Sequence, residues 1–394
     1  MASIQTNSRA GRFVQQQAGP EAFSAFVPNA LPPNPPLVLD SALQARMDRA
    51  NQALGRLDGI TLLLPNPEEF LYFYVRKEAV LSSQIEGTQS SLSDLLLYEH
   101  DATPSVSRGD VQEASNYVAA TYRGIEMLKD EGLPLSNRVL KEVHRVLLTG
   151  SRGSSQEPGE FRESQNWIGG TRPGNARFVP PPSTEVMAAM GALEKFLHGH
   201  PVQTPILVKA ALAHAQFETI HPFLDGNGRV GRLLITLLLV AEGVLDRPLL
   251  YPSLYLKTHR DVYYDYLQRV RTEGIWEEWI SFFLDGIAES AESTISTTKA
   301  IVELIDTDRQ RIQKLGRSAN TASLVHDDLT KFIVGRPGEI AKSIGMSEPP
   351  VYQALEHLER LGIARETTGR QRGRIYAYDR YLALLNEGTT DPYR

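Results

Sequence analysis

The sequence predicts a mainly α-helical protein with a short β-hairpin near its middle and a smaller α+β module at its C-terminus. Apolar residues are frequent through 208–220, which indicates a helix, and run almost unbroken through 233–241, which indicates a buried helix. Glycine, proline and asparagine gather at 166–178, a composition typical of a hairpin and its turn. A chain of 394 residues is long enough for two or more domains.

We divide the chain into four regions. Residues 1–38 are polar and then proline-rich, and we expect an extended arm with little regular structure. Residues 39–110 are expected to form two or three helices, and residues 111–315 a helical core with trailing helices. A break in composition within 317–334 separates these from a module at 320–385. After the hairpin, helical periodicity predicts helices at about 184–198, 204–220, 229–242, 258–272 and 276–315.

The overall composition excludes several classes of site. A net charge of -6 gives no general attraction to nucleic acid or to anionic membranes. The absence of cysteine excludes disulfides, thiol nucleophiles and cysteine-ligated zinc. Because no apolar run reaches membrane-spanning length and the N-terminus lacks a signal-peptide core, we expect a soluble, cytoplasmic protein without membrane association.

Residues 221–232, His-Pro-Phe-Leu-Asp-Gly-Asn-Gly-Arg-Val-Gly-Arg, lie between these two helices and carry the densest chemistry of the chain. His221 is a proton acceptor near neutral pH. Asp225 is an oxygen ligand suited to a magnesium ion that phosphates also hold. Gly226 and Gly228 let the backbone approach an anion at the start of the following helix, where free N–H groups and the helix dipole favour negative charge.

Two arginines complete this segment. Arg229 and Arg232 stand three residues apart, so both can face one anion from the first turn of the helix. Each part alone is ordinary, because a lone histidine after a helix or a Gly-Asn-Gly turn is usually structural. Base, metal ligand, anion cradle and arginines together indicate phosphoryl or nucleotidyl transfer.

At every defining position this string resembles the motif of the Fic family of AMP transferases. The resemblance implies that His221 deprotonates a Tyr, Thr or Ser hydroxyl of a target protein, and that Asp225 holds Mg²⁺ (or Mn²⁺) against the phosphates of ATP. It implies an anion hole and phosphate contacts at Gly226, Asn227, Gly228, Arg229 and Arg232, with Phe223 and Leu224 completing the loop and Phe223 anchoring it to the core. Related kinases carry lysine at position 228, so Gly228 favours transfer of AMP over transfer of phosphate.

A second segment, Ser82-Ser-Gln-Ile-Glu86-Gly87, is similar to the inhibitory motif of the same family. Taken alone, Ser83 and Glu86 would instead form a capping box at a helix N-terminus. The resemblance implies that Glu86 occupies Arg232 as a carboxylate–guanidinium pair and so restrains the transfer of AMP. Some relatives use this glutamate to remove AMP from the target, and the sequence leaves that second activity open.

The hairpin region resembles the flap of Fic proteins. The family implies that residues 166–178 bind the main chain of a target protein by strand-like hydrogen bonds beside the active site. Weaker nucleotide contacts are suggested for Gln216, His259 and Tyr263. Relatives often have asparagine where His259 stands, and Tyr263 is equally well explained as a core aromatic.

The C-terminal module is similar to a winged helix, because 338–361 reads as helix–turn–helix and 362–378 as two strands joined by a basic loop. Its arginines could meet DNA phosphates. Against DNA, the second helix carries Glu356 and Glu359 and no lysine, and such modules also serve in dimerisation or protein binding. The loop arginines are Arg365, Arg370, Arg372 and Arg374.

Two functions remain open at this level. The first is an autoinhibited AMP transferase that uses ATP and Mg²⁺ and modifies target proteins, including itself. The second is a DNA-binding regulator whose Fic core senses nucleotide. Intact His221, Asp225 and both arginines favour the enzyme, since a sensor would not need the base. A homodimer is compatible with the resemblance.

Overall fold

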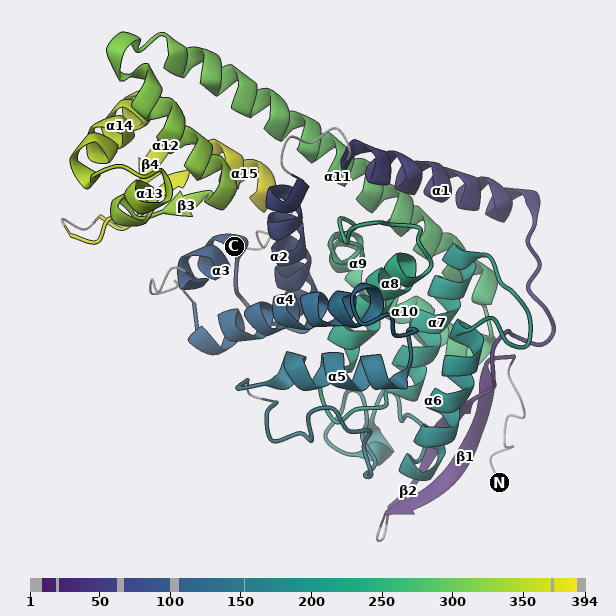
Figure 1. Ribbon diagram of the computed structural model, residues 1–394. Helices are drawn as coiled ribbons and strands as arrows, with labels where there is room; N and C mark the ends of the chain where they lie inside the picture. Colours follow the sequence, from purple (N-terminus) through teal and green to yellow (C-terminus); the bar gives the residue numbers. More distant parts are fainter. Residues whose placement is uncertain are drawn as a thin grey trace.

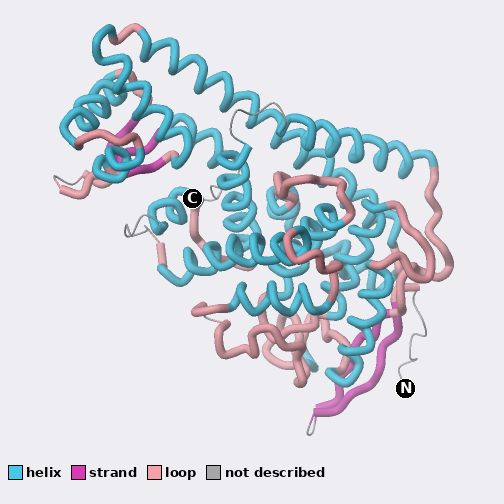
Figure 2. The backbone as a smooth tube through the Cα atoms, in the orientation of Figure 1, coloured by secondary structure: helices cyan, strands magenta, loops and turns pink. Residues whose placement is uncertain are grey.

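The computed structural model describes residues 9–18, 21–61, 67–99, 106–151, 153–369 and 372–387. It is mainly helical, as the sequence predicts (Figures 1 and 2). Within the described part of the chain, one continuous apolar core runs from Ala10 near the N-terminus to Leu385 near the C-terminus. The elements are therefore packed into one body, and none of the four regions that we expected stands apart.

Helices α7 (Ile206–Ile220) and α8 (Asn227–Ala241) form the centre of this body. All residues of α7 from Leu207 onward are buried, including the polar side chains of His214, Gln216 and Glu218, although the sequence predicted only an apolar-rich helix here. The segment between these two helices holds the 221–232 motif. The helices packed around the pair are α2 (Pro67–Ile85), α4 (Arg108–Lys129), α5 (Asn137–Leu148), α6 (Ser183–Leu197), α10 (Arg260–Glu273) and α11 (Trp276–Gln313).

Helix α11 spans the length of the molecule and connects the core to the C-terminal elements (Figure 1). Helix α1 (Ser41–Thr61) lies along its N-terminal half, where Arg49 pairs with Glu292 at 2.8 Å. Two short helices, α3 (Leu92–Glu99) and α9 (Ser253–Thr258), pack against α2. Because α2 leads directly into Glu86, its neighbours determine where the inhibitory motif lies.

The N-terminal region differs from our expectation of an arm with little regular structure. Strands β1 (Gly11–Ala18) and β2 (Glu21–Pro28) form an antiparallel hairpin, and residues 29–40 then follow without regular structure. Apolar side chains of β2 explain the difference, because Phe23, Ala25, Phe26 and Val27 are buried while Ser24 is exposed. The sequence-based prediction gave more weight to the prolines than to this short apolar stretch.

The flap is reduced to a single β-bridge. Ile168 and Phe178 exchange both backbone hydrogen bonds, at 2.8 and 3.1 Å, and a 3₁₀ turn η1 (Pro173–Asn175) lies between them. The Phe26 N–H of β2 donates to the Val179 carbonyl at 2.9 Å, so the N-terminal hairpin lies beside the flap. Arg172 of the flap pairs with Glu21 of β2 at 2.9 Å. The flap is therefore supported by the region that we expected to be irregular.

The C-terminal module contains the helix–turn–helix and the strands that the sequence predicts. Helices α13 (Pro337–Ser343) and α14 (Glu348–Arg360) precede a small antiparallel sheet of order β3-β5-β4. The segment taken as a break in composition is itself mostly helix α12 (Ala319–Phe332). The strands are β3 (Val334–Gly335), β4 (Ala364–Glu366) and β5 (Tyr376–Tyr378), and helix α15 (Asp379–Asn386) follows. A winged helix remains our interpretation of this module.

The module packs against the segments around the inhibitory motif. Tyr381 of α15 meets Phe73 of α2 edge to face with ring centroids 5.7 Å apart, and Asn386 donates to the Ser93 hydroxyl of α3 at 3.0 Å. At its base, the buried Asp308 of α11 accepts from the Tyr378 hydroxyl at 2.9 Å. The C-terminal module is thus attached to both α11 and the helices that flank Glu86.

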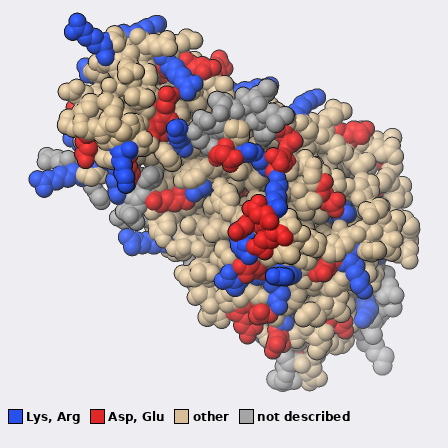
Figure 3. All heavy atoms as spheres, in the orientation of Figure 1, with Lys and Arg blue, Asp and Glu red and all other residues tan. Residues whose placement is uncertain are grey.

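Charges on the surface are mixed in sign. Acidic and basic side chains are interspersed over the face drawn in Figure 3. In the module, Arg365 is paired with Asp379 at 2.6 Å, and Arg370 lies outside the described residues. None of the helices in the described ranges is long and apolar enough to cross a membrane.

Candidate active site

The motif loop begins and ends on left-handed backbone. His221 closes α7 with a φ of 49°, which is uncommon for a residue with a side chain. Gly226, with a φ of 76°, precedes the first residue of α8. The Asn227 side chain accepts from the Phe223 N–H and donates to the Phe223 carbonyl, both at 2.8 Å. These hydrogen bonds fold the loop back onto the start of α8, which is the anion-binding position that the sequence predicts.

Phe223 anchors the loop to the core. It is fully buried and stacks on the His144 imidazole with ring centroids 3.7 Å apart. The Gly159 N–H donates to His144 Nδ1 at 2.9 Å, so the proton of the neutral ring is on Nε2, which donates to the Asp225 carbonyl at 3.0 Å. Burial lowers the pKa of His144 to about 4, which keeps the ring neutral and this arrangement intact at neutral pH.

Two buried arginines hold the base side of the site. Arg162 Nε donates to the His221 carbonyl at 2.9 Å, and its terminal nitrogens donate to the carbonyls of Ser164 and Pro181. Arg271 donates to the Thr219 hydroxyl and the Glu218 carbonyl, both at 3.1 Å. Both arginines therefore bind the last turn of α7, where carbonyls lack helical partners.

The same arginines connect this turn to the flap. Pro181 follows the flap directly, and the Arg271 guanidinium lies 3.8 Å from the ring centre of Phe178, one of the two bridge residues. Asn166, at the start of the flap, donates to the Phe223 carbonyl at 2.9 Å. The position of the flap is consequently tied to the position of His221.

His221 is neutral at neutral pH. Burial, followed by the positive charges of Arg271 and Arg162, lowers its pKa to about 3. Within the described residues, its buried Nδ1 makes no hydrogen bond. A neutral imidazole can accept a proton, so this state is the one that a general base requires.

On the anion side, Arg232 is bound to the inhibitory segment. Its Nη2 lies 2.6 Å from Glu86 Oε1 and donates to the Ser82 carbonyl at 3.0 Å, while Nε donates to the Ser82 hydroxyl at 2.8 Å. The Arg232 side chain is 1% exposed, whereas that of Glu86 is 36% exposed. Helix α2 ends at Ile85 and Gly87 has a φ of 101°, so this segment is the end of a helix and not the capping box at a helix start.

The Glu86 carboxylate also lies against Gly228. A methyl group added at Gly228 would come within 2.1 Å of Glu86 Oε1 and 3.1 Å of Arg232 Nη1. Burial alone would raise the pKa of Glu86, but the charge of Arg232 and its hydrogen bond outweigh burial and lower it. Glu86 is therefore an anion that occupies the space beside Gly228 at the start of α8, which we call the glycine cradle.

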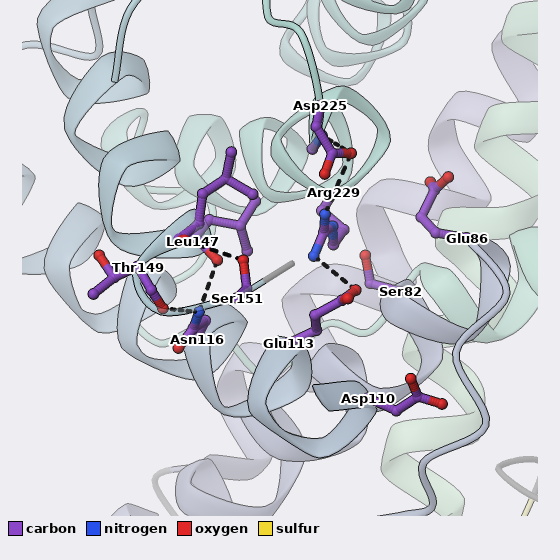
Figure 4. Close-up of polar contacts among 12 residues, drawn as sticks. Ser82, Glu86, Asp110, Glu113, Asn116, Leu147, Thr149, Ser151, Asp225 and Arg229 are labelled. Atoms are coloured by element: carbon purple, nitrogen blue, oxygen red, sulfur yellow. Dashed lines mark hydrogen bonds and ion pairs between the residues drawn. The ribbon is translucent and has the colours of Figure 1, made fainter. Parts of the chain in front are cut away.

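Arg229 lies between two other carboxylates (Figure 4). Its Nη1 donates to Glu113 Oε2 of α4 at 3.1 Å, and its Nη2 is 3.7 Å from Asp225 Oδ1. The side chains of Arg229 and Glu113 are 5% and 10% exposed. Both phosphate arginines expected from the sequence are thus engaged by carboxylates from the N-terminal helices.

Asp225 can hold a hydrated divalent cation. Its side chain is 48% exposed, and its Oδ1 accepts from the Gly226 N–H at 2.6 Å. Beside Oδ2 stands Gly153, where an added methyl group would come within 2.6 Å of that oxygen, so glycine leaves space there. The described residues contain no cluster of three or more His, Cys, Asp or Glu that could hold a metal. One carboxylate with open space suits Mg²⁺ that keeps waters and phosphate oxygens as its other ligands.

The three weaker candidates have other contacts. Gln216 is buried and donates to the Asn29 carbonyl at 2.8 Å, which explains its amide without a nucleotide. The buried Tyr263 is hydrogen-bonded to His214 at 2.9 Å, as suits a core aromatic. His259 Nδ1 donates to the Tyr255 carbonyl at 3.0 Å. Nucleotide contacts of these three residues, and of the half-buried Leu224, remain predictions.

Sequence reasoning missed four polar residues of the site: Glu113, His144, Arg162 and Arg271. A signal exists for the first, because Glu113 and Asn116 share the buried face of α4 with Tyr117 and Ala120. Polar residues at apolar positions of a helix indicate a buried partner. Arg271 gives the same signal, because it shares the buried face of α10 with Tyr263 and Leu267, and so does His144 beside Val143 and Leu147 on α5. Arg162 gives none, since an isolated arginine in a polar segment is usually exposed.

Two family models match this chain. The Fic/DOC family N-terminal model matches residues 44–126, and the Fic/DOC family model matches residues 134–239. The second match includes the whole 221–232 motif, and the first includes Ser82, Glu86 and Gly87. The two segments that the sequence singled out therefore lie in two separate matched regions.

Curated relatives carry the name Protein adenylyltransferase Fic. Those from Aedes aegypti and Culex quinquefasciatus are each 31% identical over 262 residues, which is 63% of this chain and 46% of the relative. This chain thus spans somewhat less than half the length of these relatives.

Solved structures agree in fold. A Fic family protein from Desulfovibrio desulfuricans G20 superposes with a TM-score of 0.55 at 20% identity, covering 87% of this chain and 97% of that one. Fic-1 from C. elegans gives 0.50 at 22% identity, covering 66% of this chain and 74% of that one. By these matches the chain contains a Fic/DOC family N-terminal domain and a Fic/DOC family domain, and it shares the fold of solved Fic proteins.

Proposed function

We propose that this protein transfers AMP from ATP to a Tyr, Thr or Ser hydroxyl of a target protein and that Glu86 restrains the reaction. The observation that carries this proposal is the pairing of Glu86 with Arg232 against Gly228, because it puts an anion in the place where a nucleotide phosphate would bind. A neutral His221 at the other end of the same loop supplies the base. The name of the curated relatives agrees with this activity.

The reaction needs one bond to form and one to break. The target hydroxyl loses its proton to His221, and its oxygen forms a bond to the α-phosphorus of ATP. The bond from the α-phosphorus to the bridging oxygen of the β-phosphate breaks, and pyrophosphate leaves. The backbone at Gly226 and Gly228 and the guanidinium groups of Arg229 and Arg232 stabilise the charge on the phosphates.

A divalent cation is part of the proposal. Mg²⁺, held by Asp225, would neutralise phosphate charge when it is bound with ATP. The space that Gly153 leaves beside Asp225 Oδ2 supports this assignment. We propose Mg²⁺ as the physiological ion and Mn²⁺ as a functional substitute.

Inhibition follows from competition for one arginine. A phosphate and the Glu86 carboxylate cannot both bind Arg232 and occupy the space over Gly228. Ser82 supports the inhibited state, because its hydroxyl and carbonyl accept from the same guanidinium. Activation therefore requires the end of α2 to move or Glu86 to rotate away.

The flap is our candidate for target binding. Ile168 and Phe178 form a β-bridge in a segment that is tied to His221 through Arg162. A target strand added to the edge of residues 166–178 would bring its hydroxyl towards the base.

The test is the intact mass of the Glu86→Gly protein after incubation with ATP and Mg²⁺, compared with the Glu86→Gly/His221→Ala protein. We expect a gain equal to one AMP that disappears without His221, through self-modification. A gain equal to one phosphate would contradict AMP transfer. If no mass is gained, the same pair is incubated with a cell extract and labelled ATP. Failure to label any protein in a His221-dependent way would favour the nucleotide-sensing regulator.

A further inference from the structure

Arg229 shares its guanidinium unequally between two carboxylates. The contact with Glu113 is a hydrogen bond of 3.1 Å, whereas the contact with Asp225 is 3.7 Å and outside hydrogen-bond distance (Figure 4). The Nε of Arg229 is buried and makes no hydrogen bond within the described residues. The guanidinium is therefore directed towards Glu113 at the expense of other acceptors.

Glu113 is held rigidly. It lies on the buried face of α4 and is 7% exposed. One turn later on the same helix, Asn116 donates to the carbonyls of Leu147 and Thr149 at 3.0 and 2.7 Å, which attaches α4 to the end of α5. Figure 4 shows Glu113 and Asn116 on this helix with their contacts. A buried carboxylate on an anchored helix is a fixed partner for Arg229.

Asp225 has the opposite surroundings. It is half exposed, it lies in the motif loop, and Gly153 leaves space beside its Oδ2. If Arg229 paired fully with Asp225, the guanidinium would occupy the carboxylate that should receive the cation. Its positive charge would also stand beside that cation and oppose its binding.

Glu113 and Glu86 consequently have different roles, although both bind a motif arginine. Glu86 lies against Gly228, in the space of the phosphates. Glu113 reaches Arg229 from α4, and the atoms nearest to a methyl group added at Gly226 or Gly228 belong to other residues. Glu86 must leave before nucleotide binds, whereas Glu113 can remain.

We propose that Glu113 is a positioning residue that holds the Arg229 guanidinium off Asp225 and so keeps the Asp225 carboxylate open to a divalent cation. This role rests on the proposed function, because it needs a cation that binds with nucleotide. In this proposal Glu113, which lies outside the 221–232 motif, keeps Arg229 apart from Asp225. Outer-sphere partners of this kind typically change metal affinity by about 10–100-fold when they are removed.

The test measures nucleotide binding and not activity. The full chain with Glu86→Gly is titrated calorimetrically with α,β-methylene-ATP, which cannot release AMP, at a series of MgCl₂ concentrations. The same series is measured with Glu113→Gln added, since glutamine keeps the shape and removes the charge. We expect the half-saturating Mg²⁺ concentration to rise on the order of tenfold.

Asp110→Asn in the same Glu86→Gly background is the matched control. Asp110 is a buried acid one turn earlier on α4, and its carboxylate accepts from the Gln89 N–H and not from Arg229. This variant should leave the Mg²⁺ dependence of the parent unchanged. Thermal melting of all proteins checks folding, and if Glu113→Gln does not fold, Glu113→Asp replaces it with a smaller expected rise.

The outcomes separate the two proposals. If the Glu86→Gly parent binds nucleotide with Mg²⁺ but Glu113→Gln shows the same or a lower half-saturating Mg²⁺, the positioning role is wrong and the proposed function stands. An equal rise in the Asp110→Asn control would also overturn the role, because the effect would then be general to acids on α4. If the parent binds no nucleotide at any Mg²⁺ concentration, both proposals fall.

Discussion

The two sides of the candidate site each contain two buried arginines, and they use them differently. On the base side, Arg162 and Arg271 donate to backbone carbonyls at the end of α7 and to a hydroxyl. On the anion side, Arg229 and Arg232 face the carboxylates of Glu113 and Glu86. The same residue type is therefore part of the fold on one side and part of the binding site on the other.

The type of partner decides whether a buried arginine can exchange it for a phosphate. A buried carbonyl that loses its donor cannot turn into water, so replacing a base-side arginine is expected to destabilise the fold. A carboxylate such as that of Glu86, which is 36% exposed, can turn into water while a phosphate takes its place. The four predictions below test this contrast, from the largest expected effect to the smallest.

Removing Arg162 should have the largest effect on stability. Arg162→Leu leaves the carbonyls of His221, Ser164 and Pro181 without their donor, and we expect the free energy of unfolding to fall by about 3 kcal/mol. Urea unfolding measures the change. The control Arg365→Gln removes an exposed pair with Asp379 and should change it by no more than about 0.5 kcal/mol. An equal fall in the free energy of unfolding of the two variants would show that Arg162 is not part of what stabilises the fold.

Adding a side chain at Gly228 should weaken nucleotide binding, because the methyl group takes space that we assign to phosphate. Gly228→Ala puts a methyl group where it displaces the flexible end of Glu86 and crowds Arg232. In the Glu86→Gly background we expect ATP affinity to fall about tenfold, the typical result of overpacking by one methyl group. Calorimetric titration with α,β-methylene-ATP, which cannot release AMP, and Mg²⁺ gives the affinity. Unchanged affinity would mean that phosphate does not use this cradle.

Neutralising Arg271 should make the reaction more sensitive to acid. The pKa of His221 is about 3, lowered first by burial and then by Arg271, so the base stays deprotonated from pH 8 to well below pH 6. Without that positive charge the pKa rises above about 3, while burial still holds it below the ordinary value of about 6.5, and activity is lost as the pH falls through the raised pKa. Initial rates of Glu86→Gly and Glu86→Gly/Arg271→Gln from pH 5 to 8 test this.

We expect the initial rates of Glu86→Gly and Glu86→Gly/Arg271→Gln to agree within about twofold at pH 8 and to differ by less than about tenfold at pH 6. A constant ratio at all pH values would mean that Arg271 acts through the structure of the flap alone.

Shortening Glu86 should give the smallest effect. Glu86→Asp keeps the charge but withdraws the carboxylate by one methylene group from its 2.6 Å contact with Arg232. Loss of roughly 1 kcal/mol from this charge-assisted hydrogen bond corresponds to an increase in AMP transfer of about fivefold, below that of Glu86→Gly. Intact mass at fixed times gives both rates. A rise equal to that of Glu86→Gly would show that length, and not charge, maintains inhibition.

Much of the core could be predicted from the sequence because its signals are local. The apolar residues of α7 and α8 fix both helices and the burial of α8, and the glycines between them fix a turn at the start of α8. The meeting of Glu86 with Arg232, across 146 positions of sequence, followed from the resemblance and not from any spacing. The structure agrees with that contact.

The N-terminal hairpin and the partners of the four missed residues could not be predicted in this way. Their roles depend on which carbonyl, ring or carboxylate another element brings to them, as when Arg162 meets the end of α7 and Glu113 meets Arg229. A sequence pattern records that a position is apolar or polar, but not which distant group it faces.

The sequence by itself determined the helical class and the motif loop between two helices, and it supplied the candidates for the reacting groups. These depend on side-chain periodicity and on backbone freedom, which are properties of neighbouring residues. Only the tertiary structure decided which arginines bind backbone carbonyls and which face carboxylates, and that Arg229 lies between Glu113 and Asp225. Such choices depend on distance and burial, because the strength of a charge pair is set by the groups around it.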